Sequence, residues 1–93
     1  MKPTLHVLRL EPHDDVISIR DRLTFVRSTH VLLVWPENGA TFPRRKLDLL
    51  LVQRQAQQLA MRLALVTSDP DTVEYAQDLH ISVFPSVDAA RRT

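Results

Sequence analysis

The stretch Val31-Leu32-Leu33-Val34-Trp35-Pro36 begins with four consecutive aliphatic residues, so it has no polar face. Thr29-His30 precede the run, and Pro36 and Gly39 bound it on the other side. A short apolar run with such boundaries is typical of a strand covered on both faces, as in the interior of a parallel sheet. We therefore expect residues 31–34 to form a central strand.

Three other segments have strand-like patterns, and helical patterns separate them. The expected strands are residues 4–10, 31–34, 63–67 and 81–84. Three helices are expected between these strands. The first has an apolar stripe of Val16, Ile19, Leu23 and Val26, and the second runs from Pro43 to about Ala60. The third is short and has an apolar stripe of Val73, Ala76 and Leu79. Pro85-Ser86-Val87-Asp88 has the pattern of one more helix start.

The resulting order β-α-β-α-β-α-β predicts parallel strands joined by right-handed crossovers. We predict the α/β class, as a small three-layer Rossmann-like or flavodoxin-like fragment with a four-stranded parallel sheet. The two most apolar strands, 31–34 and 63–67, should be interior, and the first and fourth should be edges. If all helices covered one face of the sheet, the other face would need a partner.

The expected helix ends depend on a few polar residues. Asp14 or His13 is expected to cap the first helix, with Asp15 in its first turn, and Ser68 or Asp69 to cap the third. Two helices end without glycine, at Ala60-Met61 and at Leu79-His80. His80 can adopt the left-handed conformation at modest cost, so we expect it there.

Composition excludes several function classes. The chain has 93 residues, which make a single α/β domain over residues 1–93, and a formal net charge of +1 that gives nucleic-acid binding no support. The absence of cysteine excludes disulfides, thiol catalysis and thiolate metal sites. No segment reaches the roughly 18 apolar residues of a membrane span. We expect a cytoplasmic location, which includes a position on the inner face of the membrane.

Candidate site residues gather where the parallel strands end, because ligands of open parallel sheets bind beyond the carboxyl ends of the strands. A helix that begins at this edge would add the basic run Arg44-Arg45-Lys46, which can reinforce an anion site or simply be a solvated surface run. The predicted ligand-binding residues are His13, Asp14, Trp35, Glu37, Asn38, Arg44, Arg45, Ser68 and Asp69.

The acidic residues and His13 at this edge also suggest metal binding and acid–base catalysis, but both patterns are unspecific. Asp14, Asp15 and Asp69 resemble a magnesium-binding acidic pocket of receiver domains, but helix capping alone predicts acids at such positions, and the strand-terminal lysine of that pattern is missing. His13 beside Asp14 invites an acid–base role, yet no nucleophile is near in sequence. Phosphate-binding glycine loops and nucleophile elbows are absent. We predict no catalytic residue, no metal site and no cofactor.

Several of these segments together resemble a known group of proteins. The segments are residues 14–23, Val31-Leu32-Leu33-Val34-Trp35-Pro36, Leu63-Ala64-Leu65-Val66-Thr67-Ser68-Asp69-Pro70 and Val83-Phe84-Pro85-Ser86-Val87. They resemble the N-terminal soluble region of uncharacterised bacterial proteins of Chloroflexi-type lineages, some of them labelled baseplate-J-like. The resemblance implies a cytosolic domain tethered to a larger, membrane-linked protein. Relatives tend to have glycine where this chain has Ala60 and His80.

Three function hypotheses follow. The first is a non-catalytic interaction or regulatory domain, excised from a longer chain, whose partners are other domains of the same polypeptide or a separate protein. Association into homo-oligomers is left open, and nucleic acid is not expected as a partner. Contact with the membrane is expected only through a tether outside this chain. The second is a sensor for a nucleotide or another small anion, bound at the carboxyl edge of the sheet. An enzyme that uses His13 with Asp14 or Asp69 ranks third.

Overall fold

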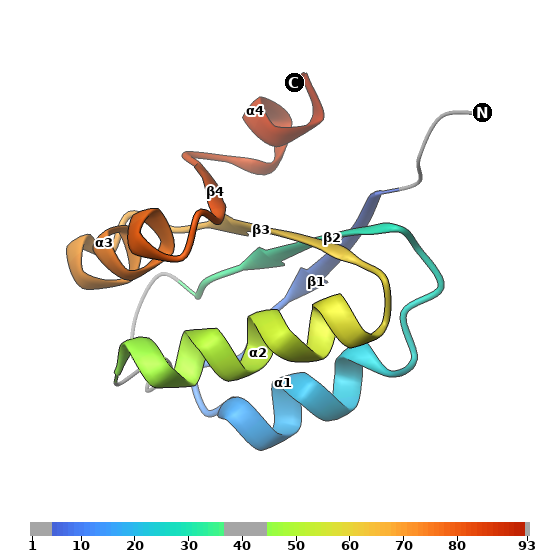
Figure 1. The fold of residues 1–93 in the computed structure, drawn as a ribbon. Coiled ribbons are helices and arrows are strands. Elements are labelled where there is room, and N and C mark those ends of the chain that lie inside the picture. The colour runs from blue at the N-terminus through green and yellow to red at the C-terminus, as the bar shows by residue number, and fades with distance from the viewer. Residues whose placement is uncertain (1–4, 37–44, 93) are drawn as a thin grey trace.

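The computed structural model describes residues 5–36 and 45–92. Its elements follow the expected alternation of strands and helices (Figure 1). They are β1 (Leu5–Arg9), α1 (Val16–Leu23), β2 (His30–Val34), α2 (Lys46–Gln58), β3 (Arg62–Val66), α3 (Pro70–Asp78), β4 (Ser82–Phe84) and α4 (Val87–Arg91).

The four strands form one parallel sheet in the order β1-β2-β3-β4. The two apolar strands β2 and β3 are therefore central, and β1 and β4 are the edges, as their sequences predict. This confirms an α/β fold with a four-stranded parallel sheet, consistent with a small flavodoxin-like fragment. Among the described strands the order never reverses, so the sheet has no switch point of the kind that forms a ligand crevice in doubly wound folds.

One face of the sheet packs against α1, α2 and α3 and carries the main core. Leu8, Leu33, Leu65 and Val83 lie side by side across the four strands on this face. Buried residues from all three helices pack against them, namely Ile19, Leu23, Leu49, Val52, Ala56 and Ala76. Leu33 is 0% exposed, as expected for the centre of the sheet.

The opposite face carries much less structure. Strand alternation places Val7, Leu32, Ala64 and Ser82 in one row across it. Of the described helices, only the five-residue α4 lies over this face, as Figure 1 shows. The expected second helical layer is therefore present only as α4. We call this side of the sheet the α4 face.

The observed caps refine two of the expected helix starts. Asp15, and not Asp14 or His13, caps α1: its carboxylate accepts the Ser18 N–H at 2.9 Å, and Ser18 Oγ accepts the Asp15 N–H at 3.0 Å. Asp14 is unavailable because its carboxylate turns back toward the Glu11 N–H. The structure places the start of α2 at Lys46, later than expected from Pro43, which lies outside the described residues.

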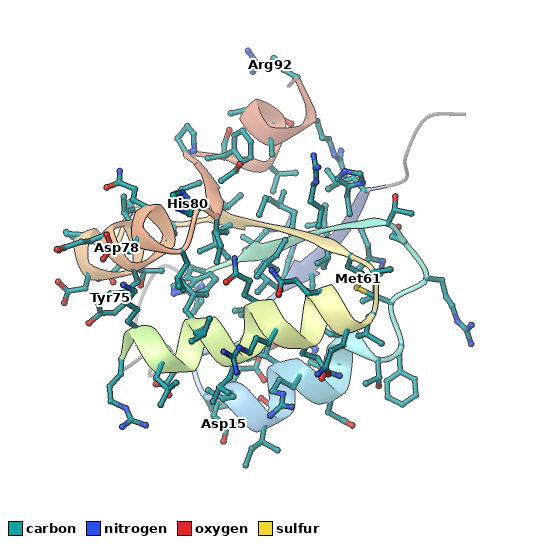
Figure 2. The ribbon with its side chains drawn as sticks, in the orientation of Figure 1. Asp15, Met61, Tyr75, Asp78, His80 and Arg92 are labelled. Carbon is teal, nitrogen blue, oxygen red and sulfur yellow. The ribbon has the colours of Figure 1, made fainter. Side chains whose placement is uncertain are left out.

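Helices α2 and α3 end in the same way. Ala60 and His80 have φ values of 58° and 60°, which confirms the left-handed conformation expected at His80. Met61 N–H donates to Ala56 O and Ile81 N–H donates to Ala76 O, both at 2.8 Å. These six-to-one bonds define a Schellman motif at each end. Each motif turns the chain directly into the next strand; Figure 2 labels Met61 and His80 at the two turns.

Candidate binding groove

Asp14, the more buried of the two predicted site carboxylates that the structure describes, is engaged within its own loop. It is 6% exposed, and its carboxylate accepts the Glu11 N–H at 2.7 Å, the Ser18 hydroxyl at 3.0 Å and Arg22 Nη1 at 2.9 Å. Arg22 Nη2 also donates to the Arg9 carbonyl at 3.0 Å. The network fixes the loop that follows β1 onto α1.

These contacts also decide the charge state of Asp14. Burial raises the pKa of this carboxyl, but the Glu11 N–H, the Ser18 hydroxyl and the positive charge of Arg22 outweigh burial. The pKa of Asp14 is consequently lower than its ordinary value. The group is therefore a stable anion whose hydrogen-bond partners are supplied by the protein itself.

The other predicted site residues are distributed along the carboxyl edge. Trp35 is buried in the core, and Asp69 caps α3 by accepting the Thr72 N–H at 3.0 Å and the Thr72 hydroxyl at 2.7 Å. His13 and Ser68 are exposed, and Arg45, also exposed, lies 3.8 Å from Asp48. Asp14 and Asp69 follow β1 and β3, which β2 separates. Glu37, Asn38 and Arg44 lie outside the described residues, so the carboxyl-edge site remains a prediction.

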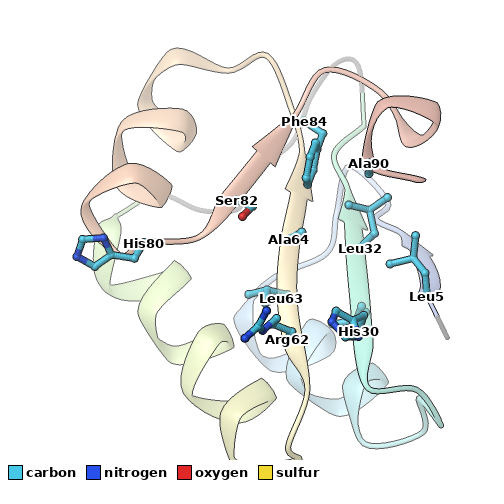
Figure 3. Close-up of a pocket in the computed structure, with 11 residues that line it drawn as sticks. Leu5, His30, Leu32, Arg62, Leu63, Ala64, His80, Ser82, Phe84 and Ala90 are labelled. Carbon is cyan, nitrogen blue, oxygen red and sulfur yellow. The ribbon is translucent and has the colours of Figure 1, made fainter. Parts of the chain in front are cut away.

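The structure contains a groove elsewhere, on the α4 face. Its volume is about 520 Å³, and Figure 3 shows the side chains that line it. Leu32 and Ala64 form the floor on the two central strands, Leu5 lines it from β1, and Phe84 and Ala90 line it from β4 and α4. Leu32 is 0% exposed although it faces away from α1, α2 and α3. The groove thus has a predominantly apolar floor that the short helix α4 covers only in part.

The ionisable side chains that line this groove are all of basic residue types. His30 and Arg62 are neighbours in the register of β2 and β3, where they begin the two central strands, and His80 lies at the margin beside β4. The described lining contains no carboxylate. Nδ1 of His30 lies 3.0 Å from the Thr29 hydroxyl, which orients the ring. An apolar floor with basic groups around it is suited to a partner that is apolar and acidic.

None of these groove residues was among the predicted site residues, because the prediction placed ligands at the carboxyl edge. A signal was present in the alternation of the central strands. The positions that face the helices are uniformly aliphatic, whereas the alternate positions include His30, Arg62 and Ala64. Polar and small residues at alternate positions indicate a face that no helix covers fully.

Neither a metal-binding cluster nor a membrane-spanning helix is found among the residues that the structure describes. No group of three or more His, Cys, Asp or Glu side chains there is arranged to hold a metal ion. None of the helices in residues 5–36 and 45–92 has the length and apolarity needed to cross a bilayer. Comparison with family models, curated proteins and solved structures finds no match to this chain.

Proposed function

We propose that this chain is a non-catalytic interaction domain of a larger bacterial protein, and that its groove binds an amphipathic helix with acidic flanks presented by another domain. The observation that carries the proposal is the groove on the α4 face, with its apolar floor at Leu32 and Ala64 and its basic residues Arg62, His30 and His80. The resemblance to membrane-linked bacterial proteins supports the setting within a larger assembly.

The occupant follows from how parallel sheets are normally covered. Such sheets are found almost only with helices on both faces, because their central strands are apolar on both sides. Here α1, α2 and α3 cover one face, and the five residues of α4 lie over part of the other. A further helix, with its apolar stripe on the incompletely buried Leu5, Ala64 and Phe84, would supply the missing cover.

Charge selects the kind of helix. Arg62 is exposed, and Arg9 extends from β1 on the same face of the sheet. Acidic side chains on the flanks of a docked helix would pair with these groups and steer its approach, whereas basic flanks would be repelled. The proposal therefore specifies an acidic partner.

The test uses two synthetic amphipathic helical peptides with the same apolar stripe, one with glutamate and one with lysine on its flanks. Each is titrated into the isotope-labelled 93-residue chain, and amide shifts are followed by NMR. We expect the acidic peptide to shift Leu32, Ala64 and Phe84, and the basic peptide to leave them unchanged.

Arg62→Glu and Arg54→Glu form a matched pair for this titration. Both residues are exposed, but Arg54 lies on α2, on the other side of the sheet. Arg62→Glu should weaken the acidic peptide about tenfold, equal to about 1.4 kcal/mol, and Arg54→Glu should leave its affinity unchanged. Equal effects of the two variants, or shifts confined to other surfaces, would refute the proposal.

A small anionic ligand is the second candidate, favoured by the size of the groove. Its volume of about 520 Å³ lies within the roughly 300–1,000 Å³ of small-molecule pockets. AMP at 100 times its dissociation constant would stabilise the chain by roughly 2.7 kcal/mol, which a thermal-shift measurement detects. Stabilisation by AMP together with NMR amide shifts at His13, Asp14 and Ser68 would instead support the predicted site at the carboxyl edge.

A further inference from the structure

The outer side of strand β1 has free backbone groups in the part of the chain that the structure describes. Leu10 N–H donates to Val34 O on β2 at 2.9 Å. Because successive residues of a strand point their backbone groups to opposite sides, those of Val7 and Arg9 point away from β2. Arg22 from α1 binds the Arg9 carbonyl, but no described residue binds the backbone of Val7 on that side.

The other edge of the sheet is protected against pairing, whereas β1 is not. β4 has only three residues, Ser82–Phe84, and Pro85 follows it directly. Short strands and proline are the usual protection of sheet edges. β1 has five residues and no proline within it, so β1 is the edge that can accept another strand.

An exposed aromatic side chain lies on the flank of α1 that faces this edge. Arg22 identifies the flank, because its guanidinium reaches the Arg9 carbonyl on the outer side of β1. Ser18, Arg22 and Phe25 have the spacing i, i+4 and i+7, so they share one side of the helical turn. Phe25 N–H donates to the Arg22 carbonyl at 3.2 Å, and the Phe25 side chain is 76% exposed. The open strand and the exposed ring are therefore on the same side of the molecule.

We infer that a second copy of this chain pairs with this edge, with the two β1 strands antiparallel around a twofold axis at Val7. Twofold homodimers are the commonest oligomers of soluble proteins. Val7 of each copy exchanges both of its outward hydrogen bonds with Val7 of the other, as opposite residues in a hydrogen-bonded antiparallel pair do. The two four-stranded sheets then form one continuous sheet. The two α1 helices lie antiparallel above the junction, and Phe25 of each covers the flank of the other.

The residues of β1 suit pairing with a copy of themselves. In the register centred on Val7, Arg9 lies opposite Leu5 and His6 lies opposite Leu8. Neither basic residue therefore meets its own kind, and the one self-pair is formed by the β-branched Val7, which packs well across strands. The formal net charge of +1 also gives two copies little mutual repulsion.

The pairing adds a charged residue to the groove on the α4 face. A twofold axis that relates neighbouring antiparallel strands is perpendicular to the sheet, so the α4 faces of both copies lie on the same side. Leu5 lines the groove, and Arg9 of the second copy lies opposite it on that face. Each copy thus extends the basic margin of the other copy's groove. The dimer itself does not depend on what the groove binds.

Analytical ultracentrifugation of the 93-residue chain across micromolar concentrations tests the inference. We expect a monomer–dimer equilibrium in the parent chain. Val7→Lys should raise the dissociation constant of the dimer at least about tenfold, because it places like charges directly opposite each other. Val7→Thr keeps the β-branched shape and should still dimerise, and circular dichroism checks that both variants are folded. A parent chain that stays monomeric, or equal dimerisation of the two variants, would overturn the inference.

Disulfide crosslinking tests the register, since the chain has no cysteine of its own. Opposite residues of a hydrogen-bonded antiparallel pair have Cα atoms about 5.5 Å apart, within the roughly 4.4–6.8 Å that a disulfide spans. Val7→Cys should therefore form a covalent dimer on mild oxidation. Arg9→Cys is the control, because the two Arg9 positions are separated by four residues along the strands, about 13 Å. Val7→Cys should crosslink at least about tenfold faster, and equal rates would contradict pairing centred on Val7.

Discussion

Arg22 on α1 lies 2.9 Å from the buried carboxylate of Asp14 and fixes the loop after β1. The same guanidinium also donates to the Arg9 carbonyl, on the outer side of β1. One side chain therefore joins the first strand, its loop and the first helix. This arrangement explains why an acid placed to cap a helix instead becomes the centre of a hydrogen-bond network.

We expect Asp14→Asn to destabilise the fold by about 1–3 kcal/mol at pH 7, since it weakens hydrogen bonds to a buried charge. The pKa of Asp14 is lowered in the folded state, so the unfolded chain binds its proton more readily. The stabilisation is complete above the ordinary pKa of about 3.9 and is lost as the pH falls through the lower folded value. Urea unfolding at several pH values should show the two chains converging in acid.

Asp21→Asn is the control for this prediction. Asp21 is an exposed carboxylate on α1, the helix that carries Arg22, so the substitution makes the same change in net charge without touching the network. Its effect at pH 7 should stay within about 0.5 kcal/mol. A difference between Asp14→Asn and the parent chain that stays constant down to pH 2 would show that the lost hydrogen bonds were neutral in character.

Much of this architecture was predictable because the aliphatic sequences of the central strands indicate directly that these strands are buried. Val31, Leu32 and Leu33 are all 0% exposed, as four consecutive aliphatic residues indicate. The order of the strands was not predictable, because an apolar strand shows that it has neighbours but not which ones. The aliphatic pattern also does not distinguish Leu32 from Leu33, although α1, α2 and α3 pack over Leu33 and Leu32 belongs to the α4 face.

The groove was harder to predict than the fold because it depends on the strand order, which the sequence does not show. It forms where residues of β1, β2, β3, β4 and α4 come together, and their proximity depends on the strand order. His30 and Arg62 are 32 positions apart in the sequence and become neighbours only in the register of β2 and β3. Capping residues such as Asp69 were predictable because a cap depends on residues only three positions away.

Leu33→Ala and Leu32→Ala measure the two faces of the central strand separately. Both side chains are fully buried, so each truncation should cost about 2–5 kcal/mol in the free energy of unfolding. Chemical denaturation of both variants gives the comparison. A cost below about 1 kcal/mol for Leu32→Ala alone would mean that α4 does not bury this side chain in solution, and the same result for Leu33→Ala would contradict the central position of β2.

The two Schellman motifs predict stabilising substitutions. Ala60 and His80 occupy the left-handed position, which costs a residue with a Cβ atom roughly 1–2 kcal/mol, while glycine loses more entropy on folding. Ala60→Gly and His80→Gly should therefore each stabilise the fold by about 0.5–1 kcal/mol. Thermal unfolding measures both changes.

The same pair of variants separates backbone strain from a role of the imidazole. His80 lines the groove and Ala60 does not, so only His80→Gly should also weaken the acidic peptide. Clear destabilisation by His80→Gly, with stabilisation by Ala60→Gly, would show that the imidazole itself holds the turn.

Two polar contacts join α2 to α3, and we expect them to differ in strength. Lys46 Nζ lies 3.3 Å from Asp78, but both side chains are about half exposed, and such surface pairs contribute roughly 0–1 kcal/mol. Gln53 Nε2 donates at 2.9 Å to the carbonyl of Leu79, in a partly buried position at the end of α3. Removing this donor leaves the carbonyl without its partner, which costs about 1–3 kcal/mol.

We therefore expect Gln53→Leu to destabilise the chain more than Lys46→Met, by at least about 1 kcal/mol. Urea unfolding in low and high salt distinguishes the two contacts, because salt screens the exposed ion pair and leaves the amide hydrogen bond largely unchanged. A larger effect of Lys46→Met that disappears in high salt would mean that charge, and not the partly buried amide, holds α3 against α2.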